Sequence, residues 1–307
     1  MSTPTGPASG LPVRMPRPRQ SGRHRRPEPV VAPEGAAALV LAVPGTPSSA
    51  SRGLAEEVIS IARSELPGLN ALIGYLDGDD AEYPALSSVL AHAAAERVAR
   101  FEQAKAAGRE VAEPEGPAAV VVPLLVGPDS TLVQGIRRAI EDSGAPAEMT
   151  DVLGPHPLLA EALHVRLSEA GLARADRARL FTVATAADGI VLATVGGEEA
   201  VQAAGITGML LAARLAVPVM AAALDVEGSV ASIAEQLKGS GSLQLAVAPY
   251  LVGPEVADGL LDAAVKEAGC ASAEPLGAYP AIGKLVLSMY MTTLGIVPAV
   301  AQGAPAL

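Results

Sequence analysis

The sequence predicts an α/β protein built as two similar three-layer α/β/α domains, each around a parallel sheet. Two observations carry this prediction. Short runs that are apolar throughout alternate with longer amphipathic stretches, and continuous apolar runs are typical of parallel strands covered by helices on both faces. In addition, four short motifs occur twice in the same order, which indicates an internal duplication.

The repeated motifs pair a segment of the first half with one of the second. They are LVLAVPG (39–45) with IVLATVG (190–196), YLD (75–77) with ALD (223–225), VVPLLVGPD (121–129) with VAPYLVGPE (247–255), and LGPHP (153–157) with LGAYP (276–280). The offset between the copies falls steadily along the chain, as an enlarged first copy would leave.

Each copy reads as four strand–helix units. In the first copy we expect strands at 39–43, 71–76 and 120–126 and a short one near Val152. The first helix shows its buried face as four residues at helical spacing: Leu54, Val58, Ile61 and Ala62. The second helix begins near Pro84, the third spans about 130–142, and the fourth begins at Pro157, since proline suits the first turn. The second copy runs from Ile190 to about Leu294.

The domain organisation follows from length and composition. At 307 residues the chain is long enough for about two domains. We place them at 36–172 and 186–307, joined by a linker near 172–188. Residues 1–35 are rich in Pro and Arg and lack apolar periodicity, so we expect a disordered tail.

Charge and hydropathy exclude several classes of function. The net charge is −11 although residues 1–34 carry six arginines, so the acidic body would repel nucleic acid. The apolar stretch 205–224 approaches the length of a membrane span, but Arg214 and Pro218 interrupt it. We expect a helix ending near Leu215, then a strand over 217–224, in a cytoplasmic protein with no membrane partner. Cys270 is the single cysteine, so no internal disulfide forms.

Candidate site residues are sought where strands end, because ligands of such folds bind at the carboxyl ends of the strands. The first copy offers Pro44, Gly45 and Thr46 after its first strand, and Asp129, Ser130 and Thr131 after its third. Phosphate-loop and dinucleotide-binding glycine motifs are absent from the sequence, so we expect no nucleotide cofactor.

The sequence gives no basis for naming a metal ligand or a catalytic residue. The four histidines are scattered, and His156 and His164 are eight residues apart, too far along a helix to share one metal. We expect His156 to stabilise a helix start and Asp129 to serve as a helix N-cap. The acidic loop 77–82 lacks the glycine that an EF-hand needs at its sixth position.

The repeated motifs resemble those of the sirohydrochlorin cobalto/ferrochelatases. The resemblance covers about residues 38–295 and implies a two-repeat chelatase-like fold. It also implies a lyase of cobalamin or siroheme biosynthesis that inserts Co²⁺ or Fe²⁺, as substrate metal, into a tetrapyrrole. Members use one histidine directly before the first-strand glycine and another after the third strand. Here those positions hold Pro44 and Ser130 or Thr131, and the second copy offers Val195 and Glu255–Val256.

Two hypotheses follow from this resemblance. The chain is either a divergent chelatase that holds the metal through substitutes such as Asp129, or a non-catalytic member that binds a tetrapyrrole, a metal or a protein partner. On either hypothesis we expect residues 44 and 131 to face one another across one cleft, between the first and third strands. The sequence does not indicate an oligomeric state.

Overall fold

The structure is a computed structural model, and it describes residues 31–296 except 34, 111–112, 114 and 174–185. The tail over 1–30 and most of the linker lie outside the described residues. Residues 29–300 belong to one compact unit, which contains both halves of the duplication.

The first half alternates strands and helices as the sequence predicts. Its elements are β1 (Ala38–Val43), α1 (Ser49–Glu65), β2 (Ala71–Tyr75), α2 (Leu86–Ala106), β3 (Ala119–Pro123), α3 (Ser130–Ser143), β4 (Ala147–Met149) and α4 (Pro157–Glu169). The four strands are parallel and lie in the order β2-β1-β3-β4.

The second half repeats this arrangement. Its elements are β5 (Gly189–Thr194), α5 (Gly197–Leu215), β6 (Val219–Ala223), α6 (Ser229–Gly239), β7 (Leu245–Pro249), α7 (Leu260–Ala268), β8 (Ala271–Ser272) and α8 (Pro280–Thr293). The strand order β6-β5-β7-β8 is the same, and all pairs are parallel. The predicted fold class, two similar α/β halves with parallel sheets, is confirmed.

Short polar residues begin three helices of the first half. Ser48 and Ser51 form a reciprocal capping box at α1, in which the Ser48 Oγ accepts from the Ser51 N–H at 3.1 Å. Asp129 accepts from the N–H groups of Thr131 and Leu132 at α3, and the His156 Nδ1 accepts from the Leu158 N–H at α4. The predicted capping roles of Asp129 and His156 are confirmed.

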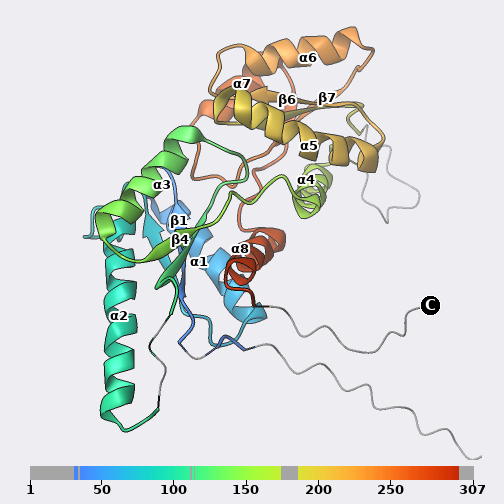
Figure 1. Cartoon of the computed structure of the whole chain (residues 1–307). Helices are drawn as coiled ribbons and strands as arrows, with labels where there is room; N and C mark the ends of the chain where they lie inside the picture. Colours follow the sequence, from blue (N-terminus) through green and yellow to red (C-terminus); the bar gives the residue numbers. More distant parts are fainter. Residues whose placement is uncertain (1–30, 34, 111–112, 114, 174–185, 297–307) are drawn as a thin grey trace, which may run out of the picture. The chain divides into compact units, whose positions relative to one another are not determined.

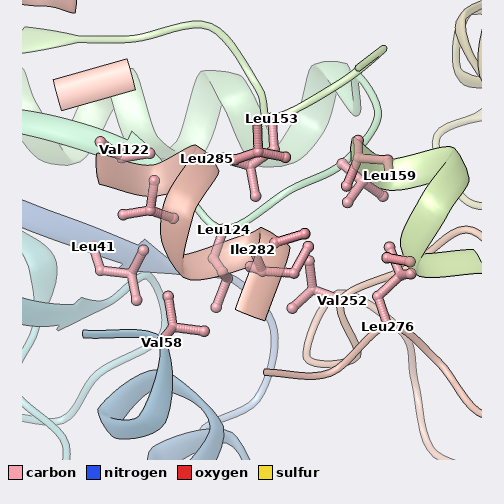
Figure 2. Close-up of a cluster of buried hydrophobic side chains, with 14 of the residues drawn as sticks. Leu41, Val58, Val122, Leu124, Leu153, Leu159, Val252, Leu276, Ile282 and Leu285 are labelled. Atoms are coloured by element: carbon pink, nitrogen blue, oxygen red, sulfur yellow. The ribbon is translucent and has the colours of Figure 1, made fainter. Parts of the chain in front are cut away.

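The core has three parts. One cluster lies between the first sheet and helices α2 and α3, and another between the second sheet and helices α6 and α7. The third and largest contains side chains from both halves, among them Leu41, Val122, Val252 and Ile282 (Figure 2). Burying apolar side chains is the main favourable term in folding, so the two halves stabilise one another.

The last helix of each half packs on the other half. Helix α8 contacts α1 and strand β3 of the first half, and α4 contacts α5 and strand β7 of the second half. Figure 1 shows α8 beside α1 and α4 beside α5. At Gly283 of α8 a β-carbon would lie 2.6 Å from Ile61 side-chain atoms, so the lack of a side chain there allows α8 to approach α1 closely.

Several boundaries differ from the sequence expectations, among them the end of the third strand, which lies at Pro123 and not at Val126. The fourth strand is β4 at 147–149, and Val152 follows it in a loop, packed against the core cluster of the first half. Its apolar character therefore reflects burial of a loop side chain. Helix α2 begins at Leu86, because Ala85 is still extended and forms a parallel bridge with Tyr75.

The apolar stretch 205–224 divides as expected. Helix α5 ends at Leu215, Ala216 takes a left-handed conformation with φ 57°, and β6 begins at Val219. Within the described part of the chain, no helix combines the length and the hydropathy needed to cross a bilayer.

Candidate functional site

A cavity of about 590 Å³ lies where loops from the two halves meet. The loop after β1, the start of α1, one residue of the loop after β2 and the loop after β7 form its walls. The lining residues are Gly45, Thr46, Pro47, Ser48, Ala50, Ser51, Leu54, Asp77 and the run Gly253–Asp258. Its volume falls within the range of small-molecule sites in proteins, about 300–1,000 Å³. The walls are the carboxyl ends of three strands, where ligands of such folds bind.

Two glycines bring the loops of the two halves into direct contact. Gly45 has φ +75°, and a β-carbon there would lie 1.9 Å from the Pro254 carbonyl oxygen. Gly196, its counterpart, has φ +107°, and a β-carbon there would lie 2.4 Å from the Pro128 carbonyl oxygen. Each first-strand loop therefore meets the third-strand loop of the opposite half.

The residues predicted after the first strand lie at this cavity. Gly45 and Thr46 are in its lining, while Pro44 is buried directly behind them and lies outside the lining. Pro44 fills the end of β1, and its lack of an N–H donor stops the ladder from continuing there.

The residues predicted after the third strand lie elsewhere. Asp129 has its carboxylate turned to the start of α3, and Ser130 and Thr131 are exposed in the first turn of that helix, outside the cavity lining. The lining of this cavity therefore contains neither residue 44 nor residue 131, which the sequence led us to expect across one cleft. Because the loops pair across the halves, the cavity brings Gly45 and Thr46 together with residues 253–258.

Glu255 is the residue of the cavity that sequence reasoning undervalued. Its Oε1 accepts from the Val252 N–H and its Oε2 from the Gly253 N–H, each at 2.6 Å. Burial raises the pKa of the Glu255 carboxyl, although these two donors act in the opposite direction. The repeat had aligned Glu255 with Asp129, and that alignment is the signal that marks it as a strand-end carboxylate.

Asp77 is the carboxylate that the first half contributes to the lining, at the start of a braced loop. The Asp79 carboxylate accepts from the N–H groups of residues 81, 82 and 83, and these bonds lower the pKa of Asp79. Arg52 of α1 lies 4.5 Å from the Tyr83 ring centroid and donates to the Glu82 carbonyl at 2.9 Å. These contacts hold the loop on α1, and Asp77 is thereby kept at the cavity rim.

The chemistry of the lining suits weak, transient binding of a metal ion. Within the described residues, no group of three or more His, Cys, Asp or Glu is arranged to hold a metal. The cavity offers carboxylate and hydroxyl oxygens, which are hard donors, and these bind Co²⁺ or Fe²⁺ less tightly than imidazole does.

Comparisons with known proteins bear on the fold. No protein-family model and no curated protein sequence matches the chain. Among solved structures, it is similar to the sirohydrochlorin chelatase SirB from Bacillus subtilis subspecies spizizenii in complex with cobalt. The two share 12% identity and a TM-score of 0.56, over 84% of this chain and 95% of that one. SirB from Bacillus subtilis with Fe³⁺ gives 14% identity and a TM-score of 0.56, over 84% and 96%. The chain has a chelatase-like fold.

A third solved structure supports the same conclusion. CbiX, described as the terminal enzyme for biosynthesis of siroheme in denitrifying bacteria, shares 16% identity and a TM-score of 0.53, over 84% of this chain and 99% of that one. The resemblance seen in the repeated motifs is thus confirmed at the level of the chelatase-like fold. The chain spans nearly the whole length of these structures.

Proposed function

We propose that this chelatase-like protein brings a divalent metal ion, Co²⁺ or Fe²⁺, together with a tetrapyrrole in the cavity between Gly45–Ser48 and Gly253–Asp258. One observation carries the proposal: the cavity lies at the carboxyl ends of strands from both halves, and each half contributes a carboxylate residue to its lining. The similar solved structures are named as sirohydrochlorin chelatases, and this supports the choice of ligand class.

Metal insertion makes a defined demand on the protein. A free tetrapyrrole carries two protons on its pyrrole nitrogens, and both must leave as the divalent ion forms its bonds to nitrogen. Glu255 is the better acceptor for the first proton, because burial raises the pKa of its carboxyl. The two backbone donors leave it lone pairs, since a carboxylate offers about four acceptor positions.

Asp77 is suited to guide the metal ion and to receive the second proton. Its side chain is exposed at the cavity rim, so it is open to ions in the surrounding water. Thr46, beside it in the lining, supplies a neutral oxygen. Weak oxygen ligands release the ion to the four nitrogens of the macrocycle without competing for it.

The proposal is tested by incubating the protein anaerobically with sirohydrochlorin and Co²⁺ and following the absorbance change of metal insertion. We expect Glu255→Gln and Asp77→Asn each to lower the insertion rate about tenfold or more, in line with the usual contribution of a general base. Asp129→Asn is the matched control, since Asn keeps the N-cap of α3 while the same charge is removed. An equal loss in the control, or no insertion above the protein-free rate in the parent, contradicts the proposal.

A second candidate function is binding without insertion. The specific observation in its favour is that the cavity lining contains no histidine among the described residues, where the resemblance implies two. The same experiment separates the candidates. If the protein only binds the tetrapyrrole, it shifts the spectrum of sirohydrochlorin in the absence of Co²⁺. When Co²⁺ is then added, metal insertion is no faster than in the protein-free reaction.

A further inference from the structure

Helix α5 carries an apolar stripe on the surface of the second half. Ile206, Met209 and Leu210 are 47%, 67% and 39% exposed, and they are three of the exposed large apolar side chains in the described part of the chain. Their spacing of three and four residues places them on one side of the helix, and the exposed Ala213 continues the line. A contiguous apolar patch on the surface of a protein usually marks an interaction surface.

Gly205 is a second observation on the same helix. A β-carbon at Gly205 would meet no atom of the described residues within 4 Å, its chain neighbours and its own helix backbone aside. Gly208 differs, because a β-carbon there would lie 3.5 Å from the Val219 side chain, so Gly208 faces the sheet. Glycine inside a helix is destabilising relative to alanine. The described chain therefore gives no packing reason for a glycine at position 205, whereas close approach of a second helix does.

We propose that a second copy of this chain binds here, with the two α5 helices antiparallel across a two-fold axis. The stripe is centred between residues 207 and 208, and an axis at that point sets Ile206 of one copy opposite Met209 of the other. Gln202 then lies opposite Ala213. Gly205 lies beside Met209 of the second copy, whose long flexible side chain suits the open space there.

The charges at the two ends of α5 favour the antiparallel arrangement. Glu198 and Glu199 are exposed in the first turn. Arg214 lies in the last turn, where its Nε donates to the His164 Nδ1 at 2.8 Å. An antiparallel pair brings the acidic end of each helix toward the basic end of the other, whereas a parallel pair brings like charges together. The surface is therefore complementary to itself, as an isologous dimer requires.

A membrane surface fits this face less well. Helices that lie on membranes carry Lys and Arg beside their apolar side, whereas α5 has two glutamates and one arginine. The net charge of the chain is −11, so anionic lipids repel it. A second copy is equally acidic, but contact along an uncharged stripe buries none of the acidic groups.

The size of the face predicts a weak dimer. A helix of 19 residues is about 28 Å long and about 10 Å wide, and α4 lies beside α5 (Figure 1). One helix and the edge of its neighbour offer less than the roughly 800 Å² per partner of a standard interface. We therefore expect a dissociation constant of the order of 10 µM, as in transient complexes.

Sedimentation velocity of the full chain, from about 1 µM to about 200 µM, measures this constant. The double variant Ile206→Glu with Met209→Glu sets like charges against one another, so the dissociation constant should rise at least about tenfold. Val98→Glu makes the same kind of change at an exposed position of α2. It is the matched control and should leave the constant within about twofold of the parent.

Gly205→Ala separates association from folding. Because the position has open space and alanine is the better helix former, the melting temperature of the monomer should rise by about 1–3 °C. The added β-carbon should block the close approach and weaken the dimer at least about fivefold. Loss of the dimer in a chain that is more stable than the parent is not a folding defect. A variant that dimerises as tightly as the parent overturns the proposed contact.

Cross-linking tests the orientation. In a Cys270→Ala background, Gln202→Cys and Ala213→Cys are treated with a short bis-maleimide, and both positions are exposed. The antiparallel pair gives covalent dimers when the two variants are mixed, whereas a parallel pair gives them with each variant alone and overturns the proposed geometry.

Three further outcomes overturn the proposal. One is a chain that stays monomeric at about 200 µM, ten times or more the expected constant. Another is a dimer that survives the double glutamate variant or that Val98→Glu weakens equally. The third is binding of the monomer to phosphatidylcholine vesicles that the double variant abolishes, which would assign the stripe to a membrane.

Discussion

The two pairs of loops that join the halves have the same plan and different carboxylates. At one pair, Gly45 contacts Pro254 and the cavity opens beside them; at the other, Gly196 contacts Pro128. Asp225, the counterpart of Asp77, accepts from the N–H groups of Gly196 and Gly197 at 3.2 and 3.0 Å. Asp77 makes no such bond within the described residues and stays exposed at the cavity rim.

The difference arises from where a helix begins. Asp129 is the N-cap of α3, which has 14 residues, whereas its counterpart Glu255 bends back onto the strand end, and α7 has only 9 residues after its N-cap Gly259. The residues that would form the first turns of α7 form instead a loop, and this loop is one wall of the cavity. The shorter helix of the second copy thus leaves room for the loop that lines the cavity.

The largest expected effect tests the loop contact itself. Gly45→Ala should lower the free energy of unfolding by about 3 kcal/mol, because it adds left-handed strain to a clash with the Pro254 carbonyl. Urea denaturation measures it. Gly144→Ala is the control: Gly144 has φ +62° with open space around it, so only about 1 kcal/mol of strain should appear. Equal losses at the two glycines would show that the halves do not press together at Gly45.

The next effect concerns a bridge between the halves that exists in one copy only. The Tyr250 hydroxyl accepts from the Thr207 Oγ1 at 3.1 Å and donates to the Val126 carbonyl at 3.3 Å, while the first half has Leu124 at the matching position. Tyr250→Phe should cost about 1–2 kcal/mol in urea denaturation, because the buried partners lose a hydrogen bond. A loss below about 0.5 kcal/mol would mean that Tyr250 stabilises the fold through packing of its ring and not through these hydrogen bonds.

Alkaline pH provides a second measurement of the same bridge. Burial raises the pKa of Tyr250 to about 12, above the ordinary value of 10.0. As the pH rises, the unfolded chain therefore loses the Tyr250 proton before the folded chain does. The contribution of this group to the free energy of unfolding is complete below pH 10, and it falls by about 1.4 kcal/mol per pH unit as the pH rises toward 12. In Tyr250→Phe the fall in stability over this range should be shallower. Part of the fall should remain, since the pKa of Tyr290 is also raised to about 12.

Two introduced histidines test whether the loop after the first strand lies beside the third-strand loop of the opposite half or beside that of its own half. Thr46→His with Val256→His places both imidazoles in one cavity lining, so this double variant should bind Co²⁺ at least about tenfold more tightly than the parent. Pro44→His with Thr131→His, the pair that the sequence led us to expect across one cleft, should bind no better than Pro44→His alone. Titration calorimetry decides between them, and the reverse order of affinities would restore the cleft expected from sequence.

The smallest expected effect tests whether Asp129 has a different role from Glu255, the carboxylate aligned with it in the repeat. Asp129→Ala should cost about 1 kcal/mol of stability through loss of the α3 N-cap, and Asp129→Asn only a few tenths, because Asn caps nearly as well. Thermal denaturation measures both. If Asp129→Asn instead changed Co²⁺ or tetrapyrrole binding, Asp129 would belong to the site, as one of the sequence-based hypotheses holds.

Much of the fold could be predicted because local patterns determine it. Strands β1 and β2 and helices α3 and α4 begin within a residue of their expected positions, since apolar runs, N-caps and proline at a helix start act within a few residues. The strand expected near Val152 does not form, because that expectation rested on a single apolar residue. One apolar residue indicates that its side chain is buried, but it does not determine the conformation of the backbone.

The site could be predicted only in part, because its geometry depends on contacts far apart in the chain. The motif that ends in Pro44 and Gly45 leads into one wall of the cavity, where Gly45 lies and Pro44 does not. The opposite wall, at 253–258, belongs to the other copy, and a repeat reveals which segments are equivalent without revealing which ones touch. Asp129 and Glu255 look alike in the sequence, and only the length of the following helix separates their roles.

The exchange of α4 and α8 has a consequence for the way the chain is made. The face of the first sheet that carries α1 is completed by α8, which the ribosome synthesises long after β3. At about 5–20 residues per second, a nascent chain that has finished β3 waits roughly ten seconds or more for this cover. During that time Leu41, Val58 and Val122 lack the partners Ile282 and Leu285 shown in Figure 2. The first half therefore leaves part of its apolar core uncovered until α8 has been synthesised.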